Sequence, residues 1–425
     1  MLFNREFTPQ LAVGAAITVY LAAALLVALP FWLTGVLSPL DALFEGVSTA
    51  TLTGMTALAS PDLVPGLLLA WRTLVLWLMG LVTVLLFVAV LPRYLHSPYL
   101  LFADRENGYY HWQLFPDLSQ AFKNLGQIYG LATLVLVGGL WLTGSDFFHS
   151  FHYGIGALTT AGFPLHQGPV IGQLTTGGEL WLALGMFCSG GSYALYYTVW
   201  KQGRQAFWQD EEWRTYVGLA VLGTLAIGFQ LWYMSHGDCG PVQIFFQVAS
   251  YASTTGYAVT DVYLWPVFCR LILAVFLFLG ACAGSTAGGL KIYRGLLLVK
   301  GFDYDIRHVF HPTIAEGVDS NGSFIKTQTL TYTEFFFVFN IMAVILVASL
   351  LAWQDFGAID SIFTAMAALS NSGGIITAAA HSGSYLAVSS LGKLGLILGM
   401  LLGRTEIFLI LVLFLPEFWQ KNKQW

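Results

Sequence analysis

Charged residues are scarce in this chain, and long uncharged stretches take their place. Only 10% of its 425 residues are Asp, Glu, Lys or Arg, whereas 56% are hydrophobic. Soluble domains usually carry about 25% charged residues, so the composition excludes an ordinary soluble protein. The segment 11–33 contains no charged residue and no histidine, and it is long enough to cross a hydrocarbon core of about 30 Å. We therefore predict an integral membrane protein surrounded by a lipid bilayer.

Cysteine is rare too, and the groupings that enzymes need are missing. The four cysteines, at positions 188, 239, 269 and 282, lack the spacing of metal ligands, although a Cys239–Cys269 disulfide stays open. No pair of acids at membrane depth, Ser/Lys dyad or His/Glu cluster points to an intramembrane enzyme. His149 and His152 are interpreted as an interfacial polar cap, because no third metal ligand accompanies them. We expect no enzyme activity, no bound cofactor and no nucleic-acid partner.

What the chain does contain is a short motif, ending in glycine, that recurs four times between apolar stretches. The copies read Thr51-Leu52-Thr53-Gly54, Thr159-Thr160-Ala161-Gly162, Ser253-Thr254-Thr255-Gly256 and Ser370-Asn371-Ser372-Gly373. Their glycines are separated by 108, 94 and 117 residues. A single copy would be an ordinary turn, but four copies at comparable intervals indicate an internal repeat.

Long and short apolar segments alternate around these motifs. The long segments are 11–34, 67–91, 125–143, 179–200, 215–235, 266–299, 331–354 and 391–415. Each pair encloses one short run, at 40–51, 147–159, 241–253 and 359–370. A run this short cannot span the bilayer as a helix, so it must enter and return, which is tolerated where the backbone is buried or lines water. The alternative, amphipathic helices on the membrane surface, needs a charged face that these runs lack.

The predicted fold is therefore all-α, with four tandem helix–pore-helix–helix repeats around a central pore. It has eight transmembrane helices and four re-entrant pore helices. The repeats are assigned to residues 1–95, 96–205, 206–305 and 306–425. Polar residues offer N-caps for three of the short helices, at Ser38, at Ser145-Asp146 and within 238–241.

The four glycine motifs form the predicted ion-binding part of this pore. Glycine reaches backbone conformations with positive φ, and the C-terminal ends of the short helices carry partial negative charge. A ring of backbone carbonyls is the structure that replaces the hydration shell of potassium in a selectivity filter. The predicted filter residues are Thr51, Leu52, Thr53, Gly54, Thr160, Ala161, Gly162, Thr254, Thr255, Gly256, Asn371, Ser372 and Gly373.

Basic residues are distributed unevenly over the predicted loops. Of the 18, 14 fall on one side, while Arg72, Arg270 and Lys393 fall towards the other and Arg404 lies within a span. The positive-inside rule places both termini and the long loops in the cytoplasm, so the glycine motifs open outward. Acids beside the motifs would attract cations to this mouth, although plain solvation explains any single one. These acids are Asp62, Asp146, Asp261 and Asp355.

The sixth long segment contains a glycine-rich run, GACAGSTAGG, at 280–289. Its glycine at every fourth position fits close helix packing, whereas a helix broken in mid-membrane would project a loop into the pore. The residues alone leave these two interpretations even. A phosphate loop is excluded, because Leu290 separates the last glycine from Lys291 and no Ser or Thr follows the lysine.

Arg404 is a charge deep inside the last predicted span. A mid-membrane arginine is costly and usually functional, so we expect a role in transport. The alternative is a structural ion pair with Glu406 or with a neighbouring repeat, although residues two apart on a helix do not face each other.

Four stretches of the sequence resemble the Trk/Ktr/HKT superfamily of potassium transporters, and the resemblance covers nearly the whole chain. They are QVASYASTTGY (247–257), GACAGSTAGGLKIYR (280–294), ALSNSG (368–373) and GRTEIFLILVLFLPEFW (403–419). The last resembles the bacterial Trk membrane subunit rather than the Ktr one. By this resemblance the filter motifs hold potassium, and a gate below them contains Gly280, Gly284, Ser285, Thr286, Gly288, Gly289 and Arg404.

The resemblance also implies a place and partners for the chain. It implies a bacterial inner-membrane protein that forms a homodimer and binds a cytoplasmic nucleotide-binding regulatory subunit. The expected function is potassium uptake through the four-repeat filter, gated by the glycine-rich loop, with potassium as substrate. A sodium-selective or cation-coupled symporter on the same scaffold is the alternative, because selectivity depends on geometry finer than a sequence specifies.

Overall fold

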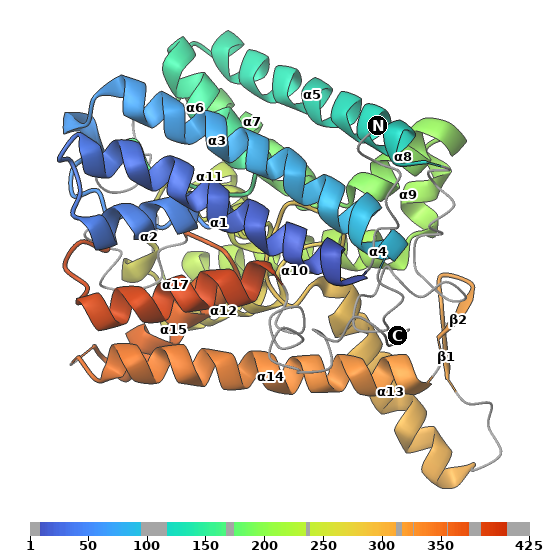
Figure 1. Ribbon diagram of the computed structural model, residues 1–425. Helices are drawn as coiled ribbons and strands as arrows, with labels where there is room; N and C mark the ends of the chain where they lie inside the picture. Colours follow the sequence, from blue (N-terminus) through green and yellow to red (C-terminus); the bar gives the residue numbers. More distant parts are fainter. Residues whose placement is uncertain are drawn as a thin grey trace.

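The computed structural model describes residues 9–94, 117–166, 174–234, 239–311, 317–325, 327–354, 356–373 and 384–405. These parts of the chain are almost entirely helical (Figure 1). Both chain ends, Asp238, Asp355, Glu406 and the last predicted span beyond residue 405 lie outside the described residues. So does the predicted boundary between the first two repeats, whereas the boundary at 305 falls inside helix α13 (Ile292–Phe310).

Among the described residues, five helices are long and apolar enough to cross a membrane. They are α1 (Pro9–Leu33), α3 (Gly66–Leu85) with its π-helical continuation η2 (Leu86–Val90), α5 (Leu118–Leu142), α10 (Glu211–Tyr233) and α14 (Thr327–Ala352). Their outer faces expose large apolar side chains; on α5, Leu131 is 59% and Leu134 is 72% exposed. Such surface is unfavourable in water and fits contact with lipid chains. The chain is a multi-pass membrane protein.

Four short helices of 12 residues each lie in the left half of Figure 1. They are α2 (Pro39–Ala50), α6 (Phe147–Leu158), α11 (Pro241–Ala252) and α15 (Ala358–Leu369). Each packs against the long helix that precedes it in the chain, which is α1, α5, α10 or α14. Between six and nine residues of each are buried. The alternative of helices lying on the membrane surface therefore does not fit.

The starts of two short helices agree with the predicted caps. The Ser38 Oγ accepts a hydrogen bond from the Asp41 N–H at 3.3 Å, and the Asp146 carboxylate accepts one from the Phe148 N–H at 3.0 Å. Helix α11 begins after Gly240, whose N–H donates to Gln243 Oε1 at 3.0 Å. These bonds satisfy N–H groups that a helix leaves unpaired at its start.

The prediction of one unbroken helix over 179–200 is wrong. The segment forms α7 (Thr176–Ser189) and α8 (Tyr193–Gln202), with a break at 190–192. Gly190 and Gly191 lie against tyrosine hydroxyls, where an added Cβ would come within 2.3 Å of Tyr216 and 2.0 Å of Tyr196. The Gly190 carbonyl accepts a hydrogen bond from the Cys282 N–H at 3.0 Å, so the break is satisfied by a distant segment.

The segment 266–299 is broken as well, which decides between the two interpretations of its glycine-rich run. Helix α12 (Val267–Leu279) ends at Leu279, with Gly280 as its C-cap, and α13 begins at Ile292, with no helix between them. The interpretation as a continuous helix with a packing face of glycines is therefore wrong. Backbone φ is positive at Gly280, Gly284 and Gly289, at 69°, 79° and 80°, which only glycine adopts readily.

The expectation of an all-α chain missed one small hairpin between α13 and α14. Strand β1 (Val318–Ser320) pairs antiparallel with β2 (Ser323–Ile325). Asn321 and Gly322 both have positive φ, 51° and 73°, as the Asn-Gly type I′ turn requires. The remaining short elements are η1 (Pro61–Leu63), α4 (Leu91–Tyr94), α9 (Gln205–Gln209), η4 (Val262–Leu264) and α17 (Ser390–Arg404).

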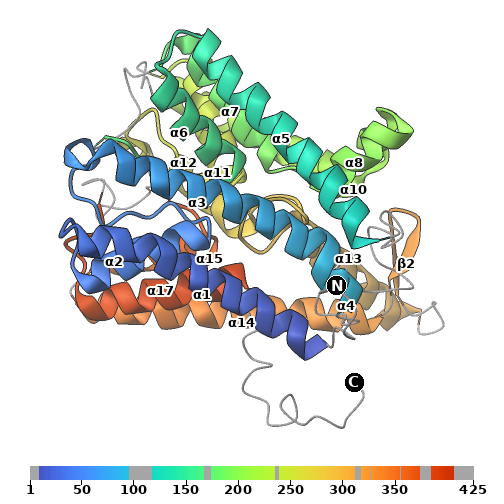
Figure 2. The same ribbon diagram turned by 45° about the horizontal axis from the view of Figure 1, so that its top comes forward.

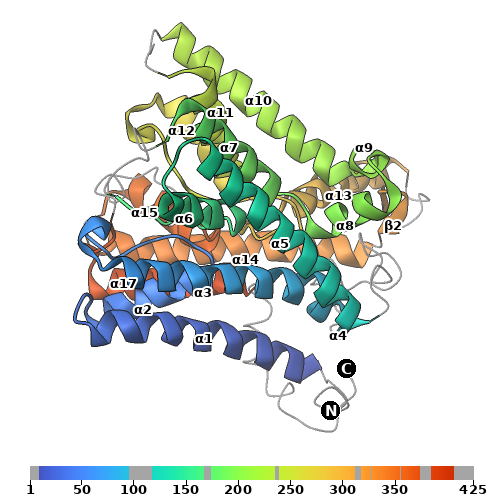
Figure 3. The same ribbon diagram turned by 90° about the horizontal axis from the view of Figure 1, so that it is seen from above.

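The helices form one bundle in which α3 lies centrally. Figure 2 shows α3 between α5, α6 and α7 on one side and α1, α2 and α17 on the other, and α3 contacts α1, α2, α5 and α6. Seen from above, α1 and α10 lie at opposite margins (Figure 3). Helix α17 packs against α2, α14 and α15. Each of the four short helices contacts at least three other helices of this bundle.

Candidate functional site

Each short helix ends in the same hydrogen-bonded turn. We name these turn 1 (51–54), turn 2 (159–162), turn 3 (253–256) and turn 4 (370–373). In turn 1 the Leu52 N–H donates to the Thr49 carbonyl at 3.2 Å, and the Thr53 N–H donates to the Ser48 carbonyl at 2.8 Å. The equivalent bonds are Thr160–Ala157, Ala161–Gly156, Thr254–Tyr251, Thr255–Ser250, Asn371–Ala368 and Ser372–Ala367, at 2.8 to 3.3 Å. This pair of bonds is the Schellman motif, which closes a helix C-terminus.

The second residue of every turn has the left-handed backbone conformation, although none is glycine. The φ angles are 57° at Leu52, 54° at Thr160, 58° at Thr254 and 49° at Asn371. The position usually takes glycine, and an L-residue there costs about 1–2 kcal/mol. Four equivalent strained positions indicate a functional site, because strain persists where the surroundings enforce it.

The four turns meet in the interior. The Gly162 N–H donates to the Thr255 carbonyl at 2.7 Å, which joins turns 2 and 3. An added Cβ on Gly54 would lie 2.8 Å from the Gly162 nitrogen, and one on Gly373 would lie 2.7 Å from the Gly54 carbonyl oxygen. The turns therefore follow one another in the order 4, 1, 2, 3. The structure thus brings the predicted filter residues together, and all of them are buried.

Turns 1 and 3 resemble each other more than they resemble turns 2 and 4. Their glycines, Gly54 and Gly256, both have φ of 89°, whereas Gly162 and Gly373 lie outside the left-handed region. In turn 1 the Thr51 and Thr53 hydroxyls are 2.7 Å apart, and in turn 3 the Ser253 and Thr255 hydroxyls are 2.7 Å apart. The site has approximate twofold rather than fourfold likeness.

The glycine-rich segment, which we define as Gly280–Gly289, lies against the ends of three short helices. The Thr286 hydroxyl donates to the carbonyl of Leu158, the last residue of α6, at 3.1 Å. The Gly288 N–H donates to the Thr254 hydroxyl of turn 3 at 3.0 Å. An added Cβ on Gly288 would lie 2.1 Å from the Ser370 carbonyl oxygen of turn 4. This segment therefore covers the turns on the side where the short helices end.

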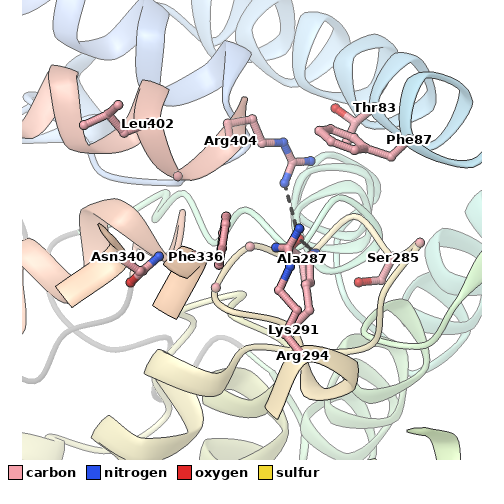
Figure 4. A pocket seen from close by; sticks show the side chains of 14 residues that line it. Thr83, Phe87, Ser285, Ala287, Lys291, Arg294, Phe336, Asn340, Leu402 and Arg404 are labelled. Atoms are coloured by element: carbon pink, nitrogen blue, oxygen red, sulfur yellow. Dashed lines mark hydrogen bonds between the residues drawn. The ribbon is translucent and has the colours of Figure 1, made fainter. Parts of the chain in front are cut away.

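Arg404 holds the same segment from α17 (Figure 4). It is 4% exposed, and its Nη1 donates to the Thr286 carbonyl at 2.8 Å and to the Ala287 carbonyl at 3.4 Å. The backbone of α17 also approaches α15 closely, because an added Cβ on Gly403 would lie 1.9 Å from the Leu369 carbonyl oxygen. The predicted contact between Arg404 and the glycine-rich segment is present.

A small cavity beside the glycine-rich segment is lined by three cationic side chains (Figure 4). Its volume is about 30 Å³, and its cations are Lys291, Arg294 and Arg404. Thr83 of α3, Ser285 of the glycine-rich segment and Asn340 of α14 complete its polar lining. A space of this size holds about two water molecules, and fixed positive charges raise the energy of a cation that enters it.

Comparison with known proteins places these features in a family. A family model described as "TrkH: Cation transport protein" matches residues 240–421. The Trk system potassium uptake protein TrkH of Escherichia coli K12 is 30% identical over 400 residues, which cover 90% of this chain and 80% of that protein. The chain belongs to the TrkH family of cation transport proteins.

Two further relatives extend the likeness of this TrkH-family chain. The Trk system potassium uptake protein TrkG of Escherichia coli K12 is 27% identical over 404 residues, covering 92% of this chain and 82% of that protein. The crystal structure of the potassium transporter TrkH from Vibrio parahaemolyticus matches with a TM-score of 0.85 and 24% identity. The match covers 98% of this chain and 87% of that one, which shows that the fold is shared.

Two buried ion pairs of this TrkH-family chain were missed in the sequence. Arg72 of α3 pairs with Glu45 of α2 at 2.5 Å, and neither side chain is exposed. Lys393 of α17 pairs with Asp41 of α2 at 2.5 Å. Both cations are exceptions to the positive-inside distribution. Their unusual position in the sequence is the signal from which buried ion pairs could have been predicted. Arg72 and Lys393 thus each bind a carboxylate on α2, whereas the third exception, Arg270, lies over the ring of Tyr263.

Glu212 was missed as well, and it joins the glycine-rich segment at Ala283 to the start of α13 at Tyr293. Its Oε1 accepts hydrogen bonds from the Ala283 N–H at 2.6 Å and from the Tyr293 N–H at 3.0 Å. The side chain is 1% exposed at the start of α10. A buried carboxylate that accepts two backbone N–H bonds fixes the backbone on both sides of a loop.

His149 and His152, which we interpreted from the sequence as one polar cap, have different surroundings in the structure. His152 is buried, with Nδ1 2.7 Å from the Thr73 hydroxyl and Nε2 3.0 Å from the Phe163 carbonyl. His149 instead has Nε2 3.2 Å from His166 Nε2 and Nδ1 3.3 Å from Asp146. Its hydrogen bond, together with the Phe148 N–H, lowers the pKa of Asp146. Among the described residues, no group of three or more His, Cys, Asp or Glu side chains could hold a metal ion, and none of the four cysteines forms a disulfide.

Proposed function

We propose that this chain takes up potassium across the bacterial inner membrane through a passage bounded by turns 1 to 4. The observation that carries the proposal is the meeting of four turns with one hydrogen-bond pattern. Each turn follows the C-terminal end of a short helix, and four such ends favour a cation between them. The related Trk proteins are named as potassium uptake proteins, which supports potassium as the substrate.

The backbone of the turns supplies the ion-binding groups in this proposal. Carbonyl oxygens of the predicted filter residues replace the water around potassium, and the glycines let neighbouring turns approach closely. The Schellman bonds hold each turn to its own helix, so the oxygens need little rearrangement when an ion enters. The polar side chains of the turns, including Thr53, Thr255 and Ser372, add oxygens on the side of the glycine-rich segment.

The glycine-rich segment is the proposed gate. It lies against turns 3 and 4, and Arg404 donates to its backbone. Opening requires the segment to leave these partners, which its glycines permit at little steric cost. The cationic cavity beside it adds an electrostatic barrier to the closed state.

Orientation and partners are also proposals. The positive-inside distribution supports cytoplasmic termini and turns that open outward. The resemblance of the sequence supports a homodimer and a cytoplasmic nucleotide-binding subunit that docks on the basic loops. Part of this basic surface is engaged within the chain, because Lys300 pairs with Glu211 at 2.5 Å.

Flux into liposomes tests the proposal directly. Purified protein is reconstituted, and the entry of rubidium, as a substitute for potassium, is compared with the entry of sodium. We expect rubidium entry to exceed sodium entry and added potassium to compete with it. Sodium entry equal to or above that of rubidium would support the sodium-selective alternative, and entry that follows a proton or sodium gradient would support a symporter. Growth of a potassium-transport-deficient bacterium at low potassium provides an independent check.

A further inference from the structure

Three short helices carry a hydrogen-bonding side chain in the same register behind the turns. In each case the side chain belongs to the residue nine positions before the glycine that ends the turn. Its backbone partner is the residue three positions after that same glycine. Glu45 Oε2 accepts from the Ala57 N–H at 2.9 Å behind turn 1. Tyr153 is hydrogen-bonded to the Leu165 backbone behind turn 2.

Gln247 repeats this arrangement behind turn 3. With its amide oriented so that oxygen and nitrogen both find suitable partners, Gln247 Oε1 accepts from the Val259 N–H at 3.1 Å. The fourth side chain in this register is Thr364, and its counterpart, residue 376, lies outside the described residues. Three chemically different side chains thus contact the same backbone position.

We propose that these side chains are braces that set the selectivity of the passage by fixing the chain where it leaves each turn. Each brace joins a helix before the turn to the chain segment after it, so it limits how far the turn can widen. A filter that distinguishes ions by the placement of backbone oxygens depends on such limits. The inference rests on the proposed function and adds positioning residues to it.

The brace behind turn 1 is the only charged one of the three, and it reaches turn 2. Glu45 also accepts from the Thr56 hydroxyl, at 3.1 and 3.0 Å, and pairs with Arg72. The Arg72 guanidinium lies 4.2 Å from the centroid of the Phe163 ring. Because Phe163 directly follows Gly162, this brace links the exits of two neighbouring turns.

Turn 3 shows how a neutral brace is built on the same scaffold. Arg72 stands seven residues after the proline that precedes α3, and Leu273 stands seven residues after the proline that precedes α12. Turn 3 therefore combines Gln247 with leucine where turn 1 combines Glu45 with arginine. A buried ion pair can be replaced by neutral residues when both partners change together, whereas removing one partner leaves a buried charge unpaired.

The test uses variants that remove the hydrogen bond without leaving a buried charge unpaired. Glu45→Gln/Arg72→Leu copies the arrangement of turn 3 and keeps an acceptor for the Ala57 N–H. Glu45→Ala/Arg72→Leu removes the acceptor. Val47→Ala, at a buried position of the same helix, is the matched control that changes packing alone. Rubidium and sodium entry into liposomes are measured for each, with thermal unfolding as a check of folding.

We expect the rubidium-to-sodium ratio to fall about tenfold in Glu45→Ala/Arg72→Leu, a change of about 1.4 kcal/mol in discrimination. The ratio should stay within about twofold of the wild type in Glu45→Gln/Arg72→Leu and in Val47→Ala. An unchanged ratio in the alanine variant, or an equal loss in the glutamine variant, overturns the inference. No selective entry in the wild-type protein would instead contradict the proposed function.

Tyr153→Phe and Gln247→Ala repeat the test behind turns 2 and 3, so the inference does not depend on the folding of one variant. Tyr153→Phe removes a hydroxyl and keeps the ring. We expect a lower rubidium-to-sodium ratio in both variants while their unfolding temperatures stay close to that of the wild type. Wild-type ratios in both would overturn the inference.

Discussion

The four turns and the glycine-rich segment are both irregular backbone inside the bundle, but they are held in different ways. Each turn is closed by bonds to its own helix, such as Leu52 to Thr49 and Thr53 to Ser48. The glycine-rich segment is held by partners far away in the chain, including Glu212 and Arg404. The turns are therefore local and self-supporting, whereas the segment depends on contacts that a movement of helices can break.

This difference fits the two roles that we propose. A selective site needs fixed oxygens, and bonds within six residues of chain provide them without help from elsewhere. A gate needs two positions of similar energy, and a segment held by a few distant hydrogen bonds can have them. Substitutions in the turns should change which ion passes, and substitutions around the segment should change how much passes.

The largest effect is expected in a turn. Gly162→Ala places a Cβ 2.5 Å from the Thr255 carbonyl oxygen, so turns 2 and 3 must separate. We expect the rubidium-to-sodium ratio in liposomes to fall at least about tenfold, or about 1.4 kcal/mol. Gly126→Ala on α5, where an added Cβ meets nothing within 4 Å, should keep the wild-type ratio. A normal ratio in Gly162→Ala would show that this turn does not line the passage.

The second effect concerns the gate. Arg404→Ala removes the donor to Thr286 and one charge of the cavity, so rubidium entry without any regulatory protein should rise about tenfold at unchanged selectivity. Shortening the glycine-rich segment by several residues should act in the same direction. Arg307→Ala, which removes a cation from an exposed pair with Asp303, is the control. Well-folded Arg404→Ala protein with wild-type or lower flux would contradict the gate.

The third effect is on stability. Glu212→Ala leaves the Ala283 and Tyr293 N–H groups without their acceptor, and each buried unpaired group costs about 1–3 kcal/mol. We expect the unfolding temperature of the detergent-solubilised protein to drop by several degrees and basal flux to rise. Glu212→Gln retains an acceptor oxygen and should lose less. Equal unfolding temperatures for Glu212→Ala and the wild type would mean that Glu212 does not hold the segment.

The smallest effect probes the strain in the turns. Thr160→Gly relieves a left-handed threonine, a gain of about 1–2 kcal/mol, but it adds about 0.5–1 kcal/mol of backbone entropy cost. We expect a net stabilisation of at most about 1.5 kcal/mol, visible as a slightly higher unfolding temperature. Ala157→Gly, within α6, should lower it. A lower temperature for Thr160→Gly would show that the left-handed conformation is not strained there.

The glycine motifs and the caps could be predicted because their structure is local. The sequence around Ser38 or Gly54 contains most of the partners that determine its conformation. The break between α7 and α8 at Gly190 could not be predicted in this way. It depends on contacts with Tyr216 and Cys282, which lie far from Gly190 in the chain. The hairpin has a local signal, the Asn321-Gly322 pair, but this pair lies outside the apolar segments from which the helices are predicted.

The polar groups that support the site depend on distant pairing. Glu45 and Arg72 are 27 residues apart, and Lys393 reaches Asp41 across 352 residues. A sequence presents these side chains as isolated charges near the ends of apolar segments. The exceptions to the positive-inside distribution marked three cations as unusual without indicating their partners. The likeness between Glu45, Tyr153 and Gln247 is also invisible until the register of each turn is known.

The central claim is that the four turns line one shared ion site, and a double-mutant cycle on turns 1 and 3 tests it most directly. Turns 1 and 3 are separated by turn 2 in the order of the turns, so Gly54→Ser and Gly256→Ser do not remove a mutual contact. The rubidium-to-sodium ratio is measured for each variant and for both together. A shared site predicts that the combined loss is well below the product of the single losses, because the first substitution has already disturbed the site. A combined loss equal to that product, or no loss in either single variant, would contradict the account.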